Sequence, residues 1–196
     1  MIKVYAAGGT RSRRVLWALE EVGVPYEVAT VKFPPRLLEP EYLVINPTGA
    51  LPAITDGDVV LIESLAICDY ISRKHGGSLT LAAGETGYDD YQQLVFYGEA
   101  TLAPPLGWVR RFGKYPEALS DARETFSQRL TYLQHKLADG RAYLAAERLT
   151  LADISVGYAL GLASLVGVSD LIPPDVAAYE ARLKARPAYQ RAYQHA

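Results

Sequence analysis

Hydroxyl side chains stand at two places where the sequence predicts the start of a helix. Thr10 and Ser12 flank Arg11, after which apolar residues recur at helical spacing. Ser64 follows Glu63 at the start of a second helical pattern. The N-terminus of a helix offers unpaired N–H groups and a partial positive charge, so these groups and an adjacent hydroxyl suit an anion. The sequence therefore indicates an anion-binding position at Ser64, and the alternative for Ser64, as for Ser12, is that the hydroxyl only caps its helix.

The stretch 46–64 combines several turn and strand signals and reads NPTGALPAITDGDVVLIES. Its Asn-Pro-Thr-Gly opening predicts a turn, and the apolar runs at 53–55 and 59–62 predict two strands. Gly57 between two aspartates predicts a hairpin, because glycine tolerates the positive φ of a tight turn. Pro52 has no N–H for a strand ladder, so it either opens the first strand or occupies a turn of unusual geometry.

Composition and charge are those of an ordinary globular protein. The chain has 196 residues, of which 49% are hydrophobic and 21% charged, with a net charge of −2 and a pI near 5.9. This balance gives no electrostatic basis for binding nucleic acid or an anionic membrane. The first apolar run is too short for a signal peptide, and no run is long enough to span a bilayer. We therefore expect a cytoplasmic protein.

The single cysteine excludes an internal disulfide and a cysteine-rich metal site, and it fits a reducing compartment. Cys68 falls on the apolar face of the helical pattern at 65–71, so we expect a buried and unreactive thiol. We predict no bound metal. Thr150 and Asp153 form a T-x-x-D pattern before an apolar run, which is typical of a capping box with a structural role.

The order of the predicted elements divides the chain into two parts. A strand at 2–6, a helix from Arg11 to Gly23 and a strand at 26–31 form a β-α-β unit, which favours a parallel strand pair. Residues 32–42 are predicted as a loop with at most a short helix. The hairpin and a helix that ends at Gly76 complete an α+β domain over 1–77. A linker at 78–87 then leads into an all-α domain over 88–196.

Helical patterns fill the second domain. They are predicted at 88–102, 117–137, 150–166, 175–185 and 187–193. Pro104 and Pro105 follow the first pattern and are expected to kink or break that helix. The pattern at 150–166 is apolar almost all round, which indicates burial at the centre of a helical bundle.

This layout resembles that of the cytosolic glutathione transferases, in which a thioredoxin-like domain precedes an all-α helical-bundle domain. The first helix and second strand of that family are similar to TRSRRVLWALEEVGVPYE, and its glutathione-binding segment is similar to NPTGALPAITDGD…LIES. The start of its central C-terminal helix is similar to TLADISVG. These matches come in the family's order over nearly the whole chain. The resemblance implies an enzyme that uses glutathione as co-substrate, and a homodimer.

The resemblance also implies where glutathione binds. At the position of Pro52 the family has a cis peptide bond, a minority state even for proline. It turns the N–H and C=O of the preceding residue, here Leu51, toward the cysteinyl part of glutathione, as in an added strand. Ser64 would bind the γ-glutamyl carboxylate, and Glu63 would face the ammonium group.

The glycyl carboxylate of glutathione needs a donor near the second strand and the loop that follows it. Lys32 and Arg36 are the candidates, and each could equally be a solvated surface charge. Many relatives carry Lys or Gln before the Val/Leu-Pro pair, where this chain has Ala50. The departure implies that one side-chain contact with glutathione is missing.

The chemistry that the resemblance implies is thiol activation. A thiol with a pKa near 8.5 is only about 3% ionised at pH 7, and the thiolate is the nucleophile. A hydroxyl donor and the N-terminus of the first helix would lower this pKa. The candidates are Thr10, then Tyr5, then Ser12, with Arg11 as an added positive charge. Counting along the sequence leaves them open, because the family's catalytic Ser or Cys position, counted back from the first helix, is Gly9.

In the family, the region around Pro104 and Pro105 lines the site for the second substrate. The residues concerned here are Tyr97, Thr101, Trp108 and Phe112, which could equally be core or dimer contacts. The implied reaction is attack of activated glutathione on a small hydrophobic electrophile, as in detoxification. Two alternatives stay open: another glutathione-dependent reaction (isomerisation, peroxide reduction or dehalogenation), and a glutathione-transferase-like binding module without turnover.

Overall fold

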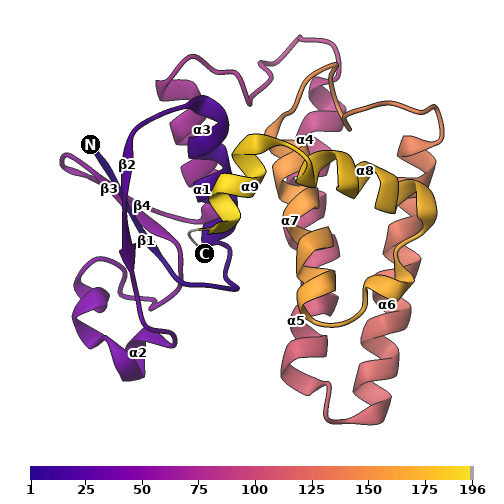
Figure 1. Cartoon of the computed structure of the whole chain (residues 1–196), viewed down its shortest axis with the longest axis horizontal. Coiled ribbons are helices and arrows are strands. Elements are labelled where there is room, and N and C mark those ends of the chain that lie inside the picture. The colour runs from indigo at the N-terminus through magenta and orange to yellow at the C-terminus, as the bar shows by residue number, and fades with distance from the viewer. Residues whose placement is uncertain (195–196) are drawn as a thin grey trace. The chain divides into compact units, whose positions relative to one another are not determined.

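The computed structural model describes residues 1–194, which form two compact units (Figure 1). The sheet unit contains Met1–Thr80 and the C-terminal segment from Arg186, and the helical unit contains Leu81–Ala185. The predicted α+β half followed by a helical half is therefore confirmed. The sequence placed all of 88–196 in the helical domain, whereas in the structure the last helix belongs to the sheet unit.

Four strands form a mixed sheet in the order β2-β1-β3-β4. β1 (Ile2–Ala6) pairs in parallel with β2 (Tyr26–Thr30), as the β-α-β unit predicted. β3 (Ala53–Asp56) pairs antiparallel with β1 and with β4 (Val59–Ile62). Gly57 makes the turn between β3 and β4 with a φ of 61°, in the region that glycine enters without steric cost.

The helices α1 (Ser12–Val22) and α3 (Ser64–Lys74) lie side by side on one face of this sheet (Figure 1). Val4 of β1 lies opposite Ile54 of β3, and both are fully buried on the helix-covered face. Because successive side chains of a strand point to opposite faces, Tyr5 lies on the other face. The sheet therefore has a core side, under the helices, and a second side that carries Tyr5.

The loop after β2 holds two short helical segments, α2 (Pro35–Leu38) and the 3₁₀ helix η1 (Pro40–Val44). A proline opens each of them, where its missing N–H is not needed and its fixed φ suits a helix start. The sequence predicted at most one short helix here and missed η1. Both segments support the turn that follows them, described below.

Helices make up the ordered elements of the helical unit. They are α4 (Tyr88–Phe96), the π-helical η2 (Tyr97–Leu102), α5 (Ala103–Phe112), α6 (Pro116–Leu137), α7 (Leu151–Leu165), the 3₁₀ helix η3 (Ser169–Leu171) and α8 (Pro174–Lys184). Every residue of α7 from Leu151 to Leu160 is buried, as its apolar pattern predicted.

Pro104 and Pro105 were predicted to kink or break the helix. They interrupt its α-helical hydrogen bonding, but the chain stays helical through them. They stand in the first turn of α5, and the wider η2 precedes them. Pro105 has no N–H to bond the C=O four residues earlier, which belongs to Thr101. Nη1 of Arg129 donates to this oxygen instead, at 2.5 Å. A side chain of α6 thus satisfies the carbonyl that the proline leaves open.

The predicted capping box at the start of α7 is present. Oδ2 of the buried Asp153 accepts from the N–H and the hydroxyl of Thr150 at 2.8 and 3.0 Å. Its Oδ1 accepts from the N–H of Leu144 at 2.9 Å and from the hydroxyl of Tyr179 at 2.8 Å. Burial raises the pKa of Asp153, and the four donors oppose this rise. One carboxylate therefore joins α7 to the loop before it and to α8.

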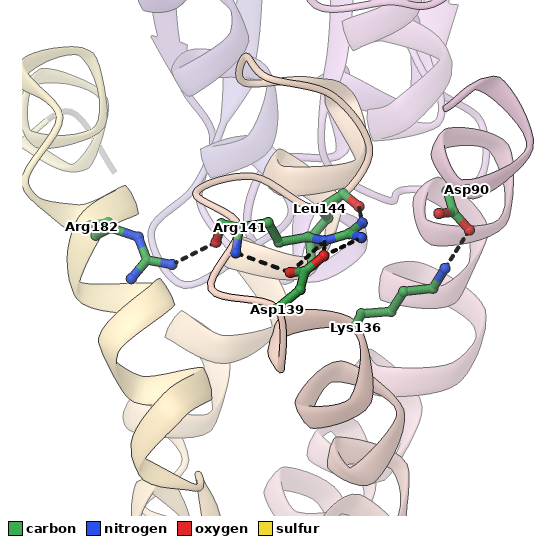
Figure 2. A network of polar contacts seen from close by, with 6 residues as sticks. All are labelled: Asp90, Lys136, Asp139, Arg141, Leu144 and Arg182. Atoms are coloured by element: carbon green, nitrogen blue, oxygen red, sulfur yellow. Dashed lines mark hydrogen bonds and ion pairs between the residues drawn. The ribbon is translucent and has the colours of Figure 1, made fainter. Parts of the chain in front are cut away.

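The loop before α7 is also held by Arg141, whose contacts are shown in Figure 2. Its Nε and Nη2 donate to Asp139 at 3.0 and 2.7 Å, and this pairing lowers the pKa of Asp139 to about 2. Nη1 of Arg141 donates to the C=O of Leu144 at 3.0 Å, while Nη2 of Arg182 donates to the C=O of Arg141 at 3.2 Å. The guanidinium of Arg141 is thus fully engaged in ordering this loop.

Candidate functional site

The peptide bond between Leu51 and Pro52 is cis, the geometry that the family resemblance implied. The C=O of Ala50 accepts from the hydroxyl of Tyr42 at 2.7 Å and from Nδ2 of Asn46 at 2.8 Å. Burial raises the pKa of Tyr42, so its hydroxyl stays protonated and keeps donating. Two buried side chains therefore fix the residue before the cis dipeptide. Neither role was predicted from the sequence, although Asn46 opens the turn signal at 46–49.

The turn before Ala50 is closed by its own side chains and by Arg36. Oδ1 of Asn46 accepts from the N–H and the hydroxyl of Thr48 at 3.1 and 2.8 Å. Nη2 of Arg36 donates to the C=O of Pro47 at 2.6 Å. Gly49 has a φ of 68°, and a Cβ there would lie 3.1 Å from Cγ of Arg36. Arg36 therefore packs against this turn and supports it.

Lys32, the other candidate for the glycyl carboxylate, has an exposed side chain in the loop just after β2. Its backbone N–H donates to Oε2 of Glu39 at 2.9 Å, which holds the loop close to the strand. The side chain of Lys32 is accessible to a ligand, whereas that of Arg36 is already bonded to the protein.

A buried cation of α1 lies next to Ser64, at the start of α3. Nη1 of Arg14, a fully buried residue of α1, lies 3.3 Å from the buried Oγ of Ser64 and donates to it. Since this contact uses a lone pair of the oxygen, the hydroxyl hydrogen of Ser64 can still be donated to an anion. Arg14 was not predicted from the sequence, and the signal that could have found it is a charged residue inside the apolar pattern of the first helix.

Glu63 precedes Ser64 with an exposed side chain and an unusual backbone. Its φ and ψ are 68° and 106°. Among the non-glycine residues within 1–194, only Glu63 has a positive φ. Such a conformation costs on the order of 1–3 kcal/mol and concentrates at functional sites. The strained backbone turns the chain sharply from β4 into α3, directly at the predicted anion position.

The start of α1 carries the two other predicted hydroxyls, which bond to each other. Oγ1 of Thr10 donates to the C=O of Ala7 at 2.7 Å and lies 2.8 Å from Oγ of Ser12. Because the hydrogen of Thr10 goes to Ala7, the hydroxyl of Ser12 is the donor to Thr10. Ser12 is fully buried, whereas Thr10 is partly accessible. Arg11 forms the N-cap of α1 between them.

Tyr5 lies on the side of the sheet away from α1. It packs on a buried cluster that contains Ala7, Tyr42 and Leu51, and its ring centroid lies 5.7 Å from that of Tyr42. Nζ of Lys3 lies 5.7 Å from the Tyr5 ring. Ala7 thus links the two regions, because it touches the Leu51 cluster and accepts the hydrogen bond from Thr10.

The sheet unit therefore brings the predicted glutathione-binding and hydroxyl positions together. The remaining four candidates belong to the helical unit. The hydroxyl of Tyr97 donates to the C=O of Arg129 at 2.6 Å, and Thr101 contacts the same arginine through its own carbonyl. Trp108 and Phe112 on α5 have 44% and 37% of their surface exposed.

Cys68 is completely buried in α3, in agreement with its expected structural role. Burial raises the pKa of its thiol to about 12, although the charge of Arg14 acts in the opposite direction. The thiol stays protonated at neutral pH, so Cys68 is no nucleophile.

Residues 1–194 contain neither a candidate membrane-spanning helix nor a candidate metal centre. None of the helices in this part of the chain is both long and apolar enough to cross a membrane. Over the same residues, no three His, Cys, Asp or Glu side chains gather in a group that could hold a metal ion.

Comparison with known proteins identifies the family. The model of the glutathione S-transferase N-terminal domain matches residues 10–74. Glutathione S-transferase 3 of Schizosaccharomyces pombe is 30% identical over 172 residues, which cover 78% of this chain and 70% of that protein. Glutathione S-transferase 1 of Zea mays is 32% identical over 198 residues, which cover 91% of this chain and 88% of that protein.

A solved structure agrees with these relatives. A glutathione transferase family member from Pseudomonas fluorescens Pf-5, determined with two glutathione bound, is 28% identical and superposes with a TM-score of 0.83. The match covers 98% of this chain and 92% of that one. The chain belongs to the glutathione S-transferase family.

Proposed function

We propose that this protein is a glutathione transferase that activates the thiol of glutathione for attack on a small hydrophobic electrophile. The observation that carries the proposal is the pairing of Arg14 with Ser64 at the start of α3, in the same unit as the cis Leu51–Pro52 bond. A buried guanidinium behind a hydroxyl, at a helix N-terminus, forms a positive site for the γ-glutamyl carboxylate.

Glutathione would be held along the end of the sheet. The backbone N–H and C=O of Leu51 would pair with its cysteinyl part, in a position that Tyr42 and Asn46 fix through Ala50. Glu63, exposed beside Ser64, would face the ammonium group of the ligand. For the glycyl carboxylate we favour Lys32 over Arg36, because Arg36 already donates to Pro47.

Thr10 is our choice for the group that activates the thiol. Its hydrogen would turn from the C=O of Ala7 to the sulfur, while Ser12 continues to donate to its oxygen and strengthens the bond. The N-terminus of α1 and the charge of Arg11 would add to this effect. Lowering the thiol pKa by about two units corresponds to a stabilisation of ~3 kcal/mol and makes roughly three quarters of the bound thiol reactive at pH 7.

The electrophile would bind beside Tyr97, Thr101, Trp108 and Phe112. The aromatic rings of Tyr97, Trp108 and Phe112 suit an apolar substrate, which fits a role in detoxification. We further propose a cytoplasmic homodimer. Val59, Val60 and Ile62 on the edge strand β4 have 37–50% of their surface exposed, and a second subunit would cover such apolar area.

A second candidate is binding of glutathione without turnover. It is favoured by one observation: the hydroxyl hydrogens of both Thr10 and Ser12 are used inside the protein. The two candidates share the glutathione site and differ in whether the thiol pKa falls on binding. Separate measurements of affinity and of thiol ionisation therefore distinguish them.

The first expected result concerns binding. The protein is retained on immobilised glutathione, and Ser64→Ala weakens its affinity about 30-fold, since a hydrogen bond to a charged group is lost. Isothermal titration with glutathione measures this change. Ser72→Ala is the matched control, because Ser72 lies on the same helix and its hydroxyl oxygen accepts from the N–H of Leu79, within the protein. Failure of the unmodified protein to bind would refute the proposed function, and an unchanged Ser64→Ala affinity would refute the role of Ser64.

The second expected result concerns the thiol. Thr10→Ala raises the pKa of bound glutathione by about one unit and lowers turnover of a generic aryl halide about tenfold near pH 6.5. Thr10→Ser keeps the hydroxyl and retains most of the activity, and Tyr5→Phe leaves it unchanged. Thiolate absorbance against pH, with steady-state kinetics, makes the comparison. Normal turnover in Thr10→Ala, or a larger loss in Tyr5→Phe, would overturn the assignment.

A further inference from the structure

The C-terminal helix α9 (Pro187–Gln194) lies along α1 in the sheet unit (Figure 1). Nε and Nη2 of Arg186, the residue before α9, bond both carboxylate oxygens of Glu21 at 2.6 and 2.7 Å. The indole N–H of Trp17 donates to the same Glu21 at 2.9 Å. The ring of Tyr189 meets that of Trp17 edge to face, with centroids 5.0 Å apart. The last turn of α1 and its middle are therefore both held by the chain's end.

A third contact reaches the first turn of α1. The guanidinium carbon of Arg13 lies 4.6 Å from the ring centroid of Tyr193, within the range of a cation–π interaction. Tyr193 is itself stacked on Tyr189, with centroids 4.0 Å apart and planes inclined by 15°. The two helices run antiparallel, because Arg186, Tyr189 and Tyr193 contact Glu21, Trp17 and Arg13 in that order. Through the two stacked tyrosines, α9 therefore contacts α1 from Trp17 to its first turn.

Arg13 sits between the two residues that the candidate site uses. Ser12, on one side, donates to Thr10, and Arg14, on the other, donates to Ser64. The first turn of a helix lacks half of its backbone hydrogen bonds and frays readily unless side chains restrain it. A restraint on Arg13 therefore limits the movement of both neighbours and of the N–H groups at the helix start.

We infer that α9 positions the first turn of α1 for thiol activation, with Tyr193 as a positioning residue that acts through Arg13. The inference rests on the proposed function, and it adds a residue from the far end of the chain to the machinery around the sulfur. Tyr193 does not touch glutathione in this scheme. It keeps the N–H groups of α1 and the hydroxyl of Thr10 directed at the thiolate.

The test replaces the ring of Tyr193 in the full-length protein. Tyr193→Leu removes the cation–π contact but keeps an apolar side chain, and Tyr193→Phe keeps the ring. We expect Tyr193→Leu to raise the pKa of bound glutathione by about half a unit, to lower kcat near pH 6.5 about threefold, and to leave KM for glutathione within about twofold. Tyr193→Phe should match the unmodified protein in all three quantities.

Arg191→Gln is the control for general loosening of α9. Nε of Arg191 bonds Oε2 of Glu20 at 2.5 Å, at the opposite end of α1 from Arg13. This variant should lower the melting temperature as much as Tyr193→Leu and leave the thiol pKa unchanged. Arg13→Gln removes the cation from the same pair and should reproduce the pKa rise of Tyr193→Leu, which keeps the test valid if one variant folds poorly.

The outcomes test the role of Tyr193 separately from thiol activation itself. The inference is supported if the pKa of the glutathione thiol falls on binding to the unmodified protein and if, among the variants, only Tyr193→Leu and Arg13→Gln raise the pKa of the bound thiol. The inference is overturned if the thiol pKa falls on binding but is the same in both variants as in the unmodified protein, or if Arg191→Gln raises it equally. The proposed function would stand in either case. No fall in the unmodified protein overturns catalysis by thiol activation and the inference together.

Discussion

Replacement of Asp153 by alanine is expected to lower the free energy of unfolding by about 4 kcal/mol. The carboxylate accepts four hydrogen bonds from Leu144, Thr150 and Tyr179 in a buried position. Alanine would leave these donors without an acceptor, and each unsatisfied buried donor costs on the order of 1–3 kcal/mol. Relaxation of the loop and entry of water offset part of this sum. The loss would still be a large fraction of the total stability of a domain.

Urea unfolding followed by far-ultraviolet circular dichroism measures this effect. Asp153→Asn retains one acceptor oxygen and should lose about half as much stability. Asp175→Ala provides the control, since Asp175 is exposed in the first turn of α8 and its loss should cost less than about 0.5 kcal/mol. A loss below about 1 kcal/mol in Asp153→Ala would show that the carboxylate does not hold the start of α7.

Gly98→Ala is expected to destabilise the helical unit by about 3 kcal/mol. A Cβ at this position in η2 would lie 2.4 Å from Oγ and 2.6 Å from the carbonyl carbon of Ser155. Oγ of Ser155 is fixed by its bond to the C=O of Val95 at 2.7 Å, and the carbonyl carbon belongs to the backbone of α7. The two helices must move apart to admit one methyl group. This cost outweighs the gain of up to about 1 kcal/mol from replacing glycine in a helix.

Gly107→Ala is the matched control within the same unit. Gly107 lies in α5, and a Cβ there would meet no atom within 4 Å. We expect this change to stabilise the protein by about 0.8 kcal/mol, because only the helix propensity changes. Thermal unfolding of both variants makes the comparison. Equal melting temperatures for the two glycine variants would contradict the close approach of η2 and α7.

Local sequence signals predicted those elements whose limits are set by residues within or next to the element. The strands β1 and β4 have the predicted limits, because their apolar runs end at glycine, aspartate or a helix start. The start of α7 was predicted because Thr150 and Asp153 cap it from within three residues. The same signals could not give η2, whose geometry depends on Arg129 of another helix and on Gly98 against Ser155.

The candidate site divides in the same way. Pro52 and Ser64 were predicted as candidates from turn and helix-start chemistry and from the family's motif. Arg14 and Tyr42 were missed because their roles rest on partners that lie 50 and 8 residues away in the chain. A buried cation within a helix and a tyrosine in a short loop have many structural uses, so only the contacts themselves reveal what they do.

The division of the sheet unit between the two ends of the chain has a consequence for biosynthesis. Residues 1–80 leave the ribosome before the helical unit, and domains generally fold in the order of their synthesis. The side of Trp17 that Tyr189 covers nevertheless stays open until Tyr189 has been synthesised. The nascent sheet unit therefore stays incomplete, with an aromatic surface exposed, while the whole helical unit is synthesised. Chains cut short near residue 185 would keep this surface uncovered and become targets for chaperones and proteases.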